Sequence, residues 1–327
     1  MNISESYKSF LKNGKTEREC TSEIIRLAQE KGYVDINKVS RLKAGDKVYV
    51  AKWNKSIALF HVGSLPMENG MNILGAHIDS PRLDIKQNPL YESDFIVYLN
   101  THYYGGIKKY QWVTIPLALH GVVCLKDGTT VKISIGEDPD DPVFCISDIL
   151  PHLAQKQMEG NAKEFIPGED LDIICGSGIV DSGDDKEKES AKKNILELLK
   201  DKYGMEEKDF NSAELEVVPA GAPRDLGFDR SLILAYGQDD RSCAYTSVQA
   251  ILDTEKTEKT LCCLCVDKEE IGSVGATGMA SHFMENAVAE IIARLGDYSE
   301  LALRRCLNSS YMLSSDVNSA YDPMNAG

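Results

Sequence analysis

Four apolar, strand-like segments of this chain run directly into acidic or histidine-containing residues, and this pattern constrains the fold more than any other feature. The polar residues that follow the strands lie at 75–80, 238–241, 266–272 and 313–317. In open α/β sheets, ligands gather outside the carboxyl ends of the strands. The sequence therefore predicts an α/β sheet in which these four segments converge on one site.

The residue types in these segments are those that bind zinc. Imidazole nitrogens and carboxylate oxygens form catalytic zinc sites that keep one position open for water, and a two-zinc site also needs a bridging carboxylate. His77 is the candidate ligand of one ion. Asp79 lies two residues further along an extended strand, so its side chain shares a face with His77 and can accept the second imidazole proton.

Two further pairs of acidic residues fit such a site. Glu269 and Glu270 are adjacent carboxylates in apolar surroundings, which favour a nearby cation because two like charges there are costly. We expect one glutamate to bind the metal and the other to act as general base. Asp239 or Asp240 can supply the bridging carboxylate, and Arg241 is expected to pair with the aspartate that does not bind metal.

The two ends of the chain alternate between helical and strand-like patterns. Helices are predicted over 7–12, 21–31, 241–253 and 278–294. Strands are predicted over 47–51, 56–62, 72–76, 232–236, 260–266 and 311–314. This alternation is typical of an α/β domain, to which we assign residues 1–90 and 225–327.

Residues 91–224 have a different texture, with short strand-like runs separated by turns. Strands are predicted over 95–99, 113–119, 122–125 and 130–135, and helices over 146–158 and 191–203. The charged residues 181–189 are expected to form a surface loop. The segment is therefore predicted to be a β-rich insertion into the α/β domain.

The charge balance argues against some classes of partner. The chain has 327 residues, of which 51 are acidic and 36 are basic, for a formal charge of -15, whereas nucleic-acid binding requires a basic face. No run of about 18 apolar residues is present, so no transmembrane helix is expected, and residues 1–14 lack the apolar stretch of a signal peptide. We expect a cytoplasmic protein that binds neither nucleic acid nor membranes.

The nine cysteines are expected to be reduced thiols, because their number is odd and no leader sequence is expected. Cys262 and Cys265 have the spacing of a zinc or redox motif. They lie in a predicted buried strand, however, where side chains three residues apart point to opposite faces. We predict that both are small core residues.

The motifs that follow the strands resemble those of a known family. GAHIDSPRL at 75–83, QDDR at 238–241, EEIGS at 269–273 and SSD at 314–316 are similar, in this order, to the motifs of the aspartyl aminopeptidase family. That family includes vacuolar aminopeptidase I. YGGIKKYQW at 104–112 resembles the start of the inserted domain of the family, and the resemblance extends from the N-terminal helices to the last residue.

This resemblance implies a zinc-exopeptidase-like α/β sandwich with an inserted β-rich dimerisation domain at 91–224. It implies homodimers that assemble into a dodecamer. It also implies a metal-dependent aminopeptidase that removes single N-terminal residues from peptides, with Asp and Glu among the expected residues. The expected cofactors are two Zn²⁺ ions, with Co²⁺ or Mn²⁺ as alternatives.

The resemblance further implies a role for each site residue. The implied metal ligands are His77, Asp239 (the bridge), Glu270 and Asp316; Glu269 is the implied base and Asp79 the orienting carboxylate. Asp240 stands where relatives often have asparagine. His152 corresponds to a histidine that reaches the substrate carbonyl from the dimer partner, where it would stabilise the oxyanion.

One departure from the family pattern concerns the end of the chain. The family has a further histidine ligand well beyond the motif of Asp316, whereas no histidine follows His282 here. We therefore expect either a fragment of a longer protein or a truncated paralogue. Two alternatives to an active aminopeptidase stay open: an inactive assembly subunit, and a related two-zinc deacylase or carboxypeptidase.

Overall fold

The computed structural model describes residues 2–178, 189–296 and 298–326 of the chain. It divides into two compact units, the first formed by Met1–Ser80 with Pro223–Gly327 and the second by Pro81–Ala222. The expected surface loop at 181–189 lies outside the described residues except for its last residue. The domain borders were predicted after residues 90 and 224, whereas in the structure the units divide after Ser80 and Ala222.

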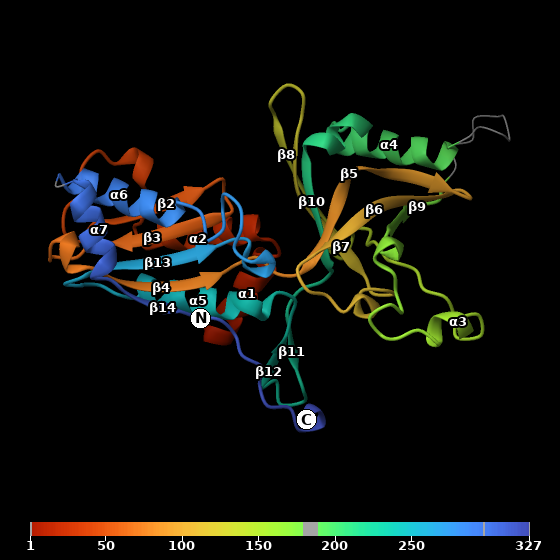
Figure 1. The fold of residues 1–327 in the computed structure, drawn as a ribbon. Helices are drawn as coiled ribbons and strands as arrows, with labels where there is room; N and C mark the ends of the chain where they lie inside the picture. The colour runs from red at the N-terminus through yellow and green to blue at the C-terminus, as the bar shows by residue number, and fades with distance from the viewer. Residues whose placement is uncertain (1, 179–188, 297, 327) are drawn as a thin grey trace. The chain divides into compact units, whose positions relative to one another are not determined.

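The first unit is built on a six-stranded mixed sheet (Figure 1). Its strands, in sheet order, are β1 (Val34–Asp35), β2 (Lys47–Lys52), β3 (Ser56–His61), β13 (Thr260–Val266), β4 (Met71–His77) and β14 (Tyr311–Ser314). Its helices are α1 (Ile3–Asn13), α2 (Glu17–Glu30), α5 (Gln238–Leu252), α6 (Phe283–Leu295) and α7 (Glu300–Asn308), and β11 (Arg224–Leu226) and β12 (Leu232–Leu234) form a separate hairpin.

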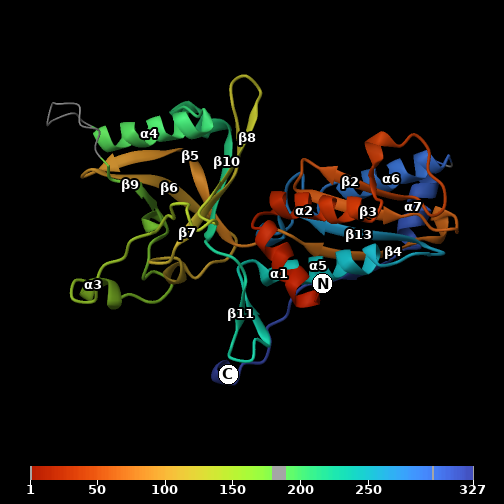
Figure 2. The same ribbon diagram turned by 180° about the vertical axis from the view of Figure 1, so that it is seen from behind.

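Helices cover both faces of this sheet. The alternation of side chains along β13 decides which residues face which layer, because successive side chains of a strand point to opposite faces. Cys262 and Leu264 pack in the core beneath α6 and α7, whereas Cys263 and Cys265 pack in the core beneath α1, α2 and α5. The same two layers are visible in the opposite view (Figure 2). The α/β sandwich is therefore confirmed, and so is the prediction that Cys262 and Cys265 are core residues on opposite faces.

The second unit contains a six-stranded antiparallel sheet. Its strands, in sheet order, are β8 (Thr130–Ile135), β7 (Leu117–Cys124), β10 (Ala213–Pro219), β5 (Arg82–Ser93), β6 (Ile96–Tyr104) and β9 (Ile173–Gly176), and its helices are α3 (Gln155–Met158) and α4 (Ser190–Tyr203). Because β5 pairs with β6 and β10, the chain enters this sheet directly after Ser80.

Several helix boundaries differ from the sequence predictions. The helix predicted over 146–158 is wrong for most of its length, since only Gln155–Met158 is helical; Pro151 lies within the segment and disfavours helix in the residue before it. Helix α2 begins at Glu17, where the Thr16 side chain caps it by accepting a hydrogen bond from Glu19 N. Helix α6 begins five residues later than predicted, at Phe283, and α7 was not predicted.

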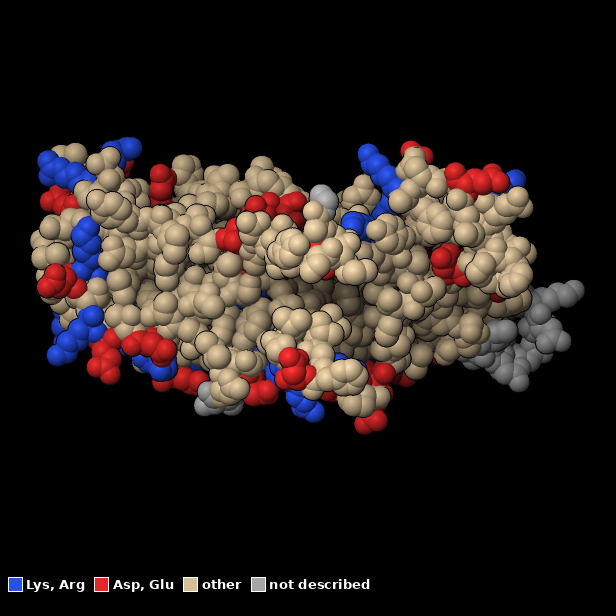
Figure 3. All heavy atoms as spheres, turned by 90° about the horizontal axis from the view of Figure 1, so that it is seen from below, with Lys and Arg blue, Asp and Glu red and all other residues tan. Residues whose placement is uncertain are grey.

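Charged side chains are interspersed over the surface in view in Figure 3, where blue and red groups lie in small clusters and not in one continuous basic area. Among the described residues, none of the helices combines the length and the apolar character that crossing a membrane requires. The expectation that the chain binds neither nucleic acid nor membranes stays a prediction.

Candidate metal centre

The four predicted segments meet at the carboxyl ends of β4, β13 and β14. Strands β13 and β14 both run parallel to β4, with Val266 beside His77 and Ser314 beside Gly75. The residues that follow these strands therefore leave the sheet at the same edge as His77. Asp239 reaches this edge from the start of α5.

Three carboxylates surround Nε2 of His77. The distances from this nitrogen are 3.3 Å to Oδ1 of Asp239, 3.7 Å to Oε2 of Glu269 and 4.0 Å to Oδ1 of Asp316. The His77 side chain is 3% exposed, whereas the three acidic side chains are 45–59% exposed. The imidazole is thus held within the fold, and the carboxylates remain open to solvent and to a substrate.

Asp79 holds His77 and the following acidic turn together. Nδ1 of His77 lies 3.0 Å from the carbonyl oxygen of Asp79 and 3.3 Å from its Oδ1. The two carboxylate oxygens of Asp79 accept hydrogen bonds from the backbone N–H groups of Glu269 and Glu270, each at 3.2 Å. Because Nδ1 faces Asp79, Nε2 is directed to the three acids.

The carboxylates around His77 favour a charged imidazole. Burial disfavours this charge, but the hydrogen bond and charge of Asp79, with the charges of Asp240 and Glu269, outweigh burial and raise the pKa of His77 to about 9. A cation would have to displace this proton in order to bind Nε2.

Glu269 and Glu270 lie on a single 3₁₀ turn, Glu269–Ile271, that follows β13. Burial is the main cause that raises the pKa of the Glu270 carboxyl to about 7, and the charge of Asp239 adds to it, while His77 acts in the opposite direction. A nearby cation would restore the ionised form at neutral pH. The two neighbours therefore differ in environment, with Glu269 the more exposed of the pair.

Asp239 and Asp240 are joined by a cis peptide bond and have non-helical backbone angles, so the regular part of α5 begins at Arg241. Asp239 points to the His77 side, whereas Asp240 is fully buried. Among the described residues, no N–H or O–H group donates to either carboxylate oxygen of Asp240. Burial raises the pKa of Asp240 to about 6, although the Cys243 thiol and His77 lower it.

Arg241 and Gly237 position the start of α5. The guanidinium of Arg241 is buried, and it donates from Nε to the carbonyl of Ile78 (3.1 Å) and from Nη2 to the carbonyl of Lys15 (3.1 Å). Gly237 has φ of 77°, and a Cβ atom added there would lie 1.8 Å from Nη1 of Arg241. Only glycine fits this close approach. Ser80 Oγ also donates to the Asp239 carbonyl (2.7 Å).

The donor set fits zinc. His77, Asp239 and Asp316 each offer one ligand atom, and these atoms lie within 4.8 Å of one another. Ligands at 2.0–2.2 Å from a tetrahedral ion stand about 3.3–3.6 Å apart, so small side-chain shifts would suffice. The Asp240 carboxylate is buried beside Asp239 in the sequence and has no N–H or O–H donor within the described part of the chain. A nearby cation would offset its negative charge.

His152 lies in the second unit, where its side chain is exposed. Its expected approach to a substrate from a dimer partner therefore stays a prediction. Ser80 and Gly237 also position the centre, and neither was predicted to do so. Both lie in or beside the conspicuous motifs, but their contacts depend on chain segments that are distant in sequence.

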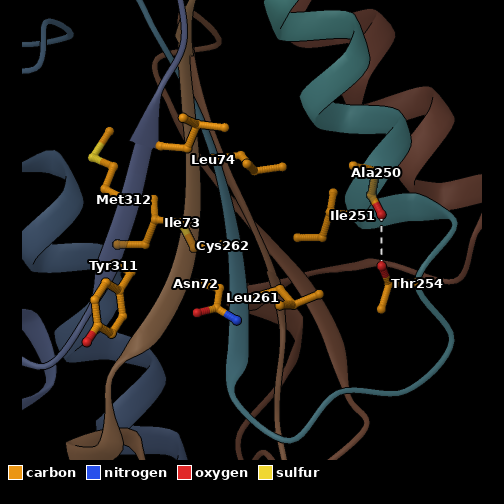
Figure 4. Close-up of a pocket in the computed structure, with 11 residues that line it drawn as sticks. Asn72, Ile73, Leu74, Ala250, Ile251, Thr254, Leu261, Cys262, Tyr311 and Met312 are labelled. Carbon is orange, nitrogen blue, oxygen red and sulfur yellow. Dashed lines mark hydrogen bonds between the residues drawn. The ribbon is translucent and has the colours of Figure 1, made fainter.

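A separate apolar groove of about 440 Å³ lies at the β14 edge of the first unit (Figure 4). Ile73 and Leu74 of β4, Ala250 and Ile251 of α5 and Met312 of β14 contribute to its lining. The predicted metal ligands are not among its lining residues.

Comparison with known proteins gives a family match over nearly the whole chain. Residues 10–326 match the model of the family described as aminopeptidase I zinc metalloprotease (M18). A relative from Clostridium acetobutylicum, described as a probable M18 family aminopeptidase 1, is 54% identical over 325 residues, which cover 98% of this chain and 70% of the relative. This chain thus spans about 70% of the length of that relative.

Solved structures show the same fold. The crystal structure of an M18 family aminopeptidase from Thermotoga maritima is 44% identical, with a TM-score of 0.94 over 99% of this chain and 71% of that chain. A more distant structure, described as the S. cerevisiae mApe1 dodecamer, is 19% identical, with a TM-score of 0.76 over 99% of this chain and 74% of that one. At this identity the second likeness concerns the fold alone.

Proposed function

This chain belongs to the aminopeptidase I zinc metalloprotease family (M18) and is a metalloaminopeptidase of that family, and we propose that the centre around His77 is where it cleaves the N-terminal residue from peptides. The observation that carries the proposal is the gathering of Asp239, Glu269 and Asp316 around Nε2 of His77. With His77, these residues come from four separate segments of the chain. A cluster of surface acids that arose by chance would have no reason to surround a buried histidine.

We propose that two zinc ions bind here. His77 and Asp316 would be terminal ligands, Asp239 would bridge and Glu270 would bind the second ion. When bound, zinc polarises a carbonyl oxygen and makes water acidic enough to react near neutral pH. Co²⁺ and Mn²⁺ remain alternative occupants, because the same imidazole and carboxylate donors accept them.

Side chains of this protein would orient the metal ligands and transfer the protons of the reaction. Asp79 keeps the His77 ring oriented through Nδ1 and holds the acidic turn by its backbone N–H groups. Glu269, half-exposed and 3.7 Å from His77 Nε2, is placed to take a proton from the attacking water at Oε2. It would then pass that proton to the leaving amine. The general acid and general base are thus one residue.

The test is a comparison of substrates that differ only at the amino group. We expect the zinc-loaded chain to hydrolyse aminoacyl p-nitroanilides and not their N-acetylated forms, and a panel of Asp, Glu and neutral residues would show its preference. The activity should disappear with a zinc chelator and return with added zinc. Preferential hydrolysis of N-acyl amino acids would indicate the deacylase alternative, and tightly bound zinc without hydrolysis would indicate an assembly subunit.

We also propose that the chain forms homo-oligomers through the second unit, with a homodimer as the building block of a dodecamer. The support is an exposed apolar segment, since Ile149, Leu150 and Leu153 are 50–71% exposed around His152. Light scattering of the purified chain would test this.

We also propose a cytoplasmic location. All nine cysteines are free thiols, as is usual for proteins of that compartment.

A further inference from the structure

A closed ring of three hydrogen bonds lies directly behind the turn of Glu269 and Glu270. Oγ of Ser56 donates to the carbonyl oxygen of Thr277 (2.6 Å), and Oγ1 of Thr277 donates to Oδ2 of Asp267 (2.6 Å). The backbone N–H of Asp267 donates to Oγ of Ser56 (3.2 Å), which closes the ring. All three residues are at most 3% exposed.

The ring connects three parts of the chain. Ser56 opens β3, Asp267 follows the last residue of β13, and Thr277 lies in the loop that returns toward α6. Asp267 and Thr277 thus lie on either side of Glu269 and Glu270 in this loop. Closing the loop at its ends limits how far the acidic turn between them can shift.

Further hydrogen bonds lie within this loop, although most of residues 269–276 are exposed. Lys268 has φ of 71°, and its carbonyl accepts a hydrogen bond from Ser273 N at 2.7 Å. The second oxygen of Asp267, Oδ1, accepts from Lys268 N at 2.8 Å. A Cβ atom on Gly278 would lie 2.2 Å from the carbonyl oxygen of Ser273. The hydrogen bond between Lys268 and Ser273 therefore spans the acidic turn and limits how far the turn can shift on its own.

Two anchors act on the turn from different elements. Asp79, after β4, accepts from the N–H groups of Glu269 and Glu270, whereas the ring holds the end of β13 and the return of the loop. Side chains at a reacting centre must be held within about 0.5 Å of their productive positions. Asp79 alone would fix the location of the two adjacent N–H groups, but the turn could still rotate about them.

We propose that Ser56, Asp267 and Thr277 are positioning residues of the metal centre, which determine where the carboxylates of Glu269 and Glu270 lie. None of the three touches substrate or metal in this proposal; each acts through the loop. The inference rests on the proposed function, because it takes Glu270 as a ligand and Glu269 as the base.

The test compares two variants at one position. Thr277→Val keeps the shape of the side chain and removes the hydroxyl, whereas Thr277→Ser keeps the hydroxyl. We expect Thr277→Val to lower zinc affinity and kcat by about 10–100-fold, with a smaller change in KM, and to alter the absorption spectrum of the Co²⁺-loaded protein. Thr277→Ser should restore both the affinity and the spectrum.

Thr260→Val is the matched control. Thr260 lies at the opposite end of β13, is equally buried, and its hydroxyl accepts a hydrogen bond from Gly63 N (3.0 Å). We expect this variant to be destabilised while its Co²⁺ spectrum, zinc affinity and kcat stay close to those of the unchanged protein. If Thr277→Val behaves in the same way, the ring has only a structural role and the inference is wrong.

Two more variants cover other outcomes. If Thr277→Val fails to fold, Ser56→Ala can replace it, because this variant removes the Ser56 hydroxyl and leaves the bond between Thr277 and Asp267. We expect Ser56→Ala to cause the same change in the Co²⁺ spectrum in weaker form, and an unchanged spectrum would overturn the inference. Glu270→Ala tests the premise separately. If Glu270→Ala leaves the zinc affinity unchanged, the proposed metal site is wrong. If Glu270→Ala lowers the zinc affinity but Thr277→Val has no effect, only the role of the ring is contradicted.

Discussion

Nε2 of His77 lies 3.3 Å from Oδ1 of Asp239, although His77 ends β4 and Asp239 opens α5. This contact requires the sheet edge and the start of the helix to be placed together. The Gly237 backbone, the buried Arg241 guanidinium and the Ser80 hydroxyl all contribute to that placement. The pairing of one imidazole and one carboxylate is therefore a product of the whole first unit.

Glu269→Gln should abolish turnover and leave metal binding intact. The amide keeps the shape of the side chain but cannot accept a proton, so we expect kcat to fall by about 10²–10⁴-fold, as for a lost general base. Arylamide hydrolysis would give kcat, and elemental analysis would give the zinc content. Glu285→Gln, an exposed carboxylate on α6, is the control. Unchanged activity in Glu269→Gln would remove Glu269 from the role.

Asp79→Asn should weaken zinc binding. The amide oxygen of asparagine can accept a hydrogen bond from only one of the two backbone N–H groups that now donate to Asp79. The NH₂ group would face either the other backbone N–H or Nδ1 of His77. We expect zinc affinity to fall by about 10–100-fold, measured by competition with a chelator. Asp127→Asn, at an exposed turn where the carboxylate accepts from Thr129 N, should bind zinc normally. Equal affinities in both variants would contradict this account.

Zinc binding should release protons and weaken as the pH falls. In the metal-free centre the pKa values are raised to about 9 for His77 and about 7 for Glu270, and zinc binds the deprotonated groups. The apparent affinity should therefore fall roughly tenfold per pH unit from pH 9 to pH 7, and more steeply below pH 7.

Calorimetry in buffers of different ionisation enthalpy would count the protons released, and chelator competition from pH 6 to 9 would give the slope. Glu270→Gln removes one titrating group, so it should flatten the steep part below pH 7. An affinity that does not depend on pH would show that His77 is not protonated in the metal-free centre.

Gly237→Ala should destabilise the protein more than Gly32→Ala, a substitution at a similar φ angle. The new Cβ would meet Nη1 of Arg241 at 1.8 Å, in addition to the cost of a left-handed alanine, about 1–2 kcal/mol. We expect a loss of roughly 3 kcal/mol or more, measured by denaturant unfolding. Gly32→Ala has φ of 84° and nothing within 4 Å of the added atom, so it isolates the backbone cost. Similar losses in both variants would show that the contact with Arg241 is unimportant.

The pattern of strands and the residues that follow them could be predicted from local sequence alone. Apolar runs such as 72–76 and 260–266 formed strands as predicted, because their composition and length specify buried strands locally. The position of His77 and Asp316 at strand ends follows from the same local signal. The α/β class and the identity of the acidic segments needed no tertiary information.

The contacts that hold those segments in place could not be predicted in the same way. Asp79 accepts from Glu269 N, Arg241 donates to the carbonyls of Ile78 and Lys15, and Ser56 donates to the carbonyl of Thr277, and all of these contacts join residues far apart in the chain. Local sequence constrains backbone propensity and side-chain chemistry, whereas these contacts depend on strand order, which brings β4, β13 and β14 side by side. Their partners are therefore set by packing of the whole sheet, which no short stretch of residues encodes.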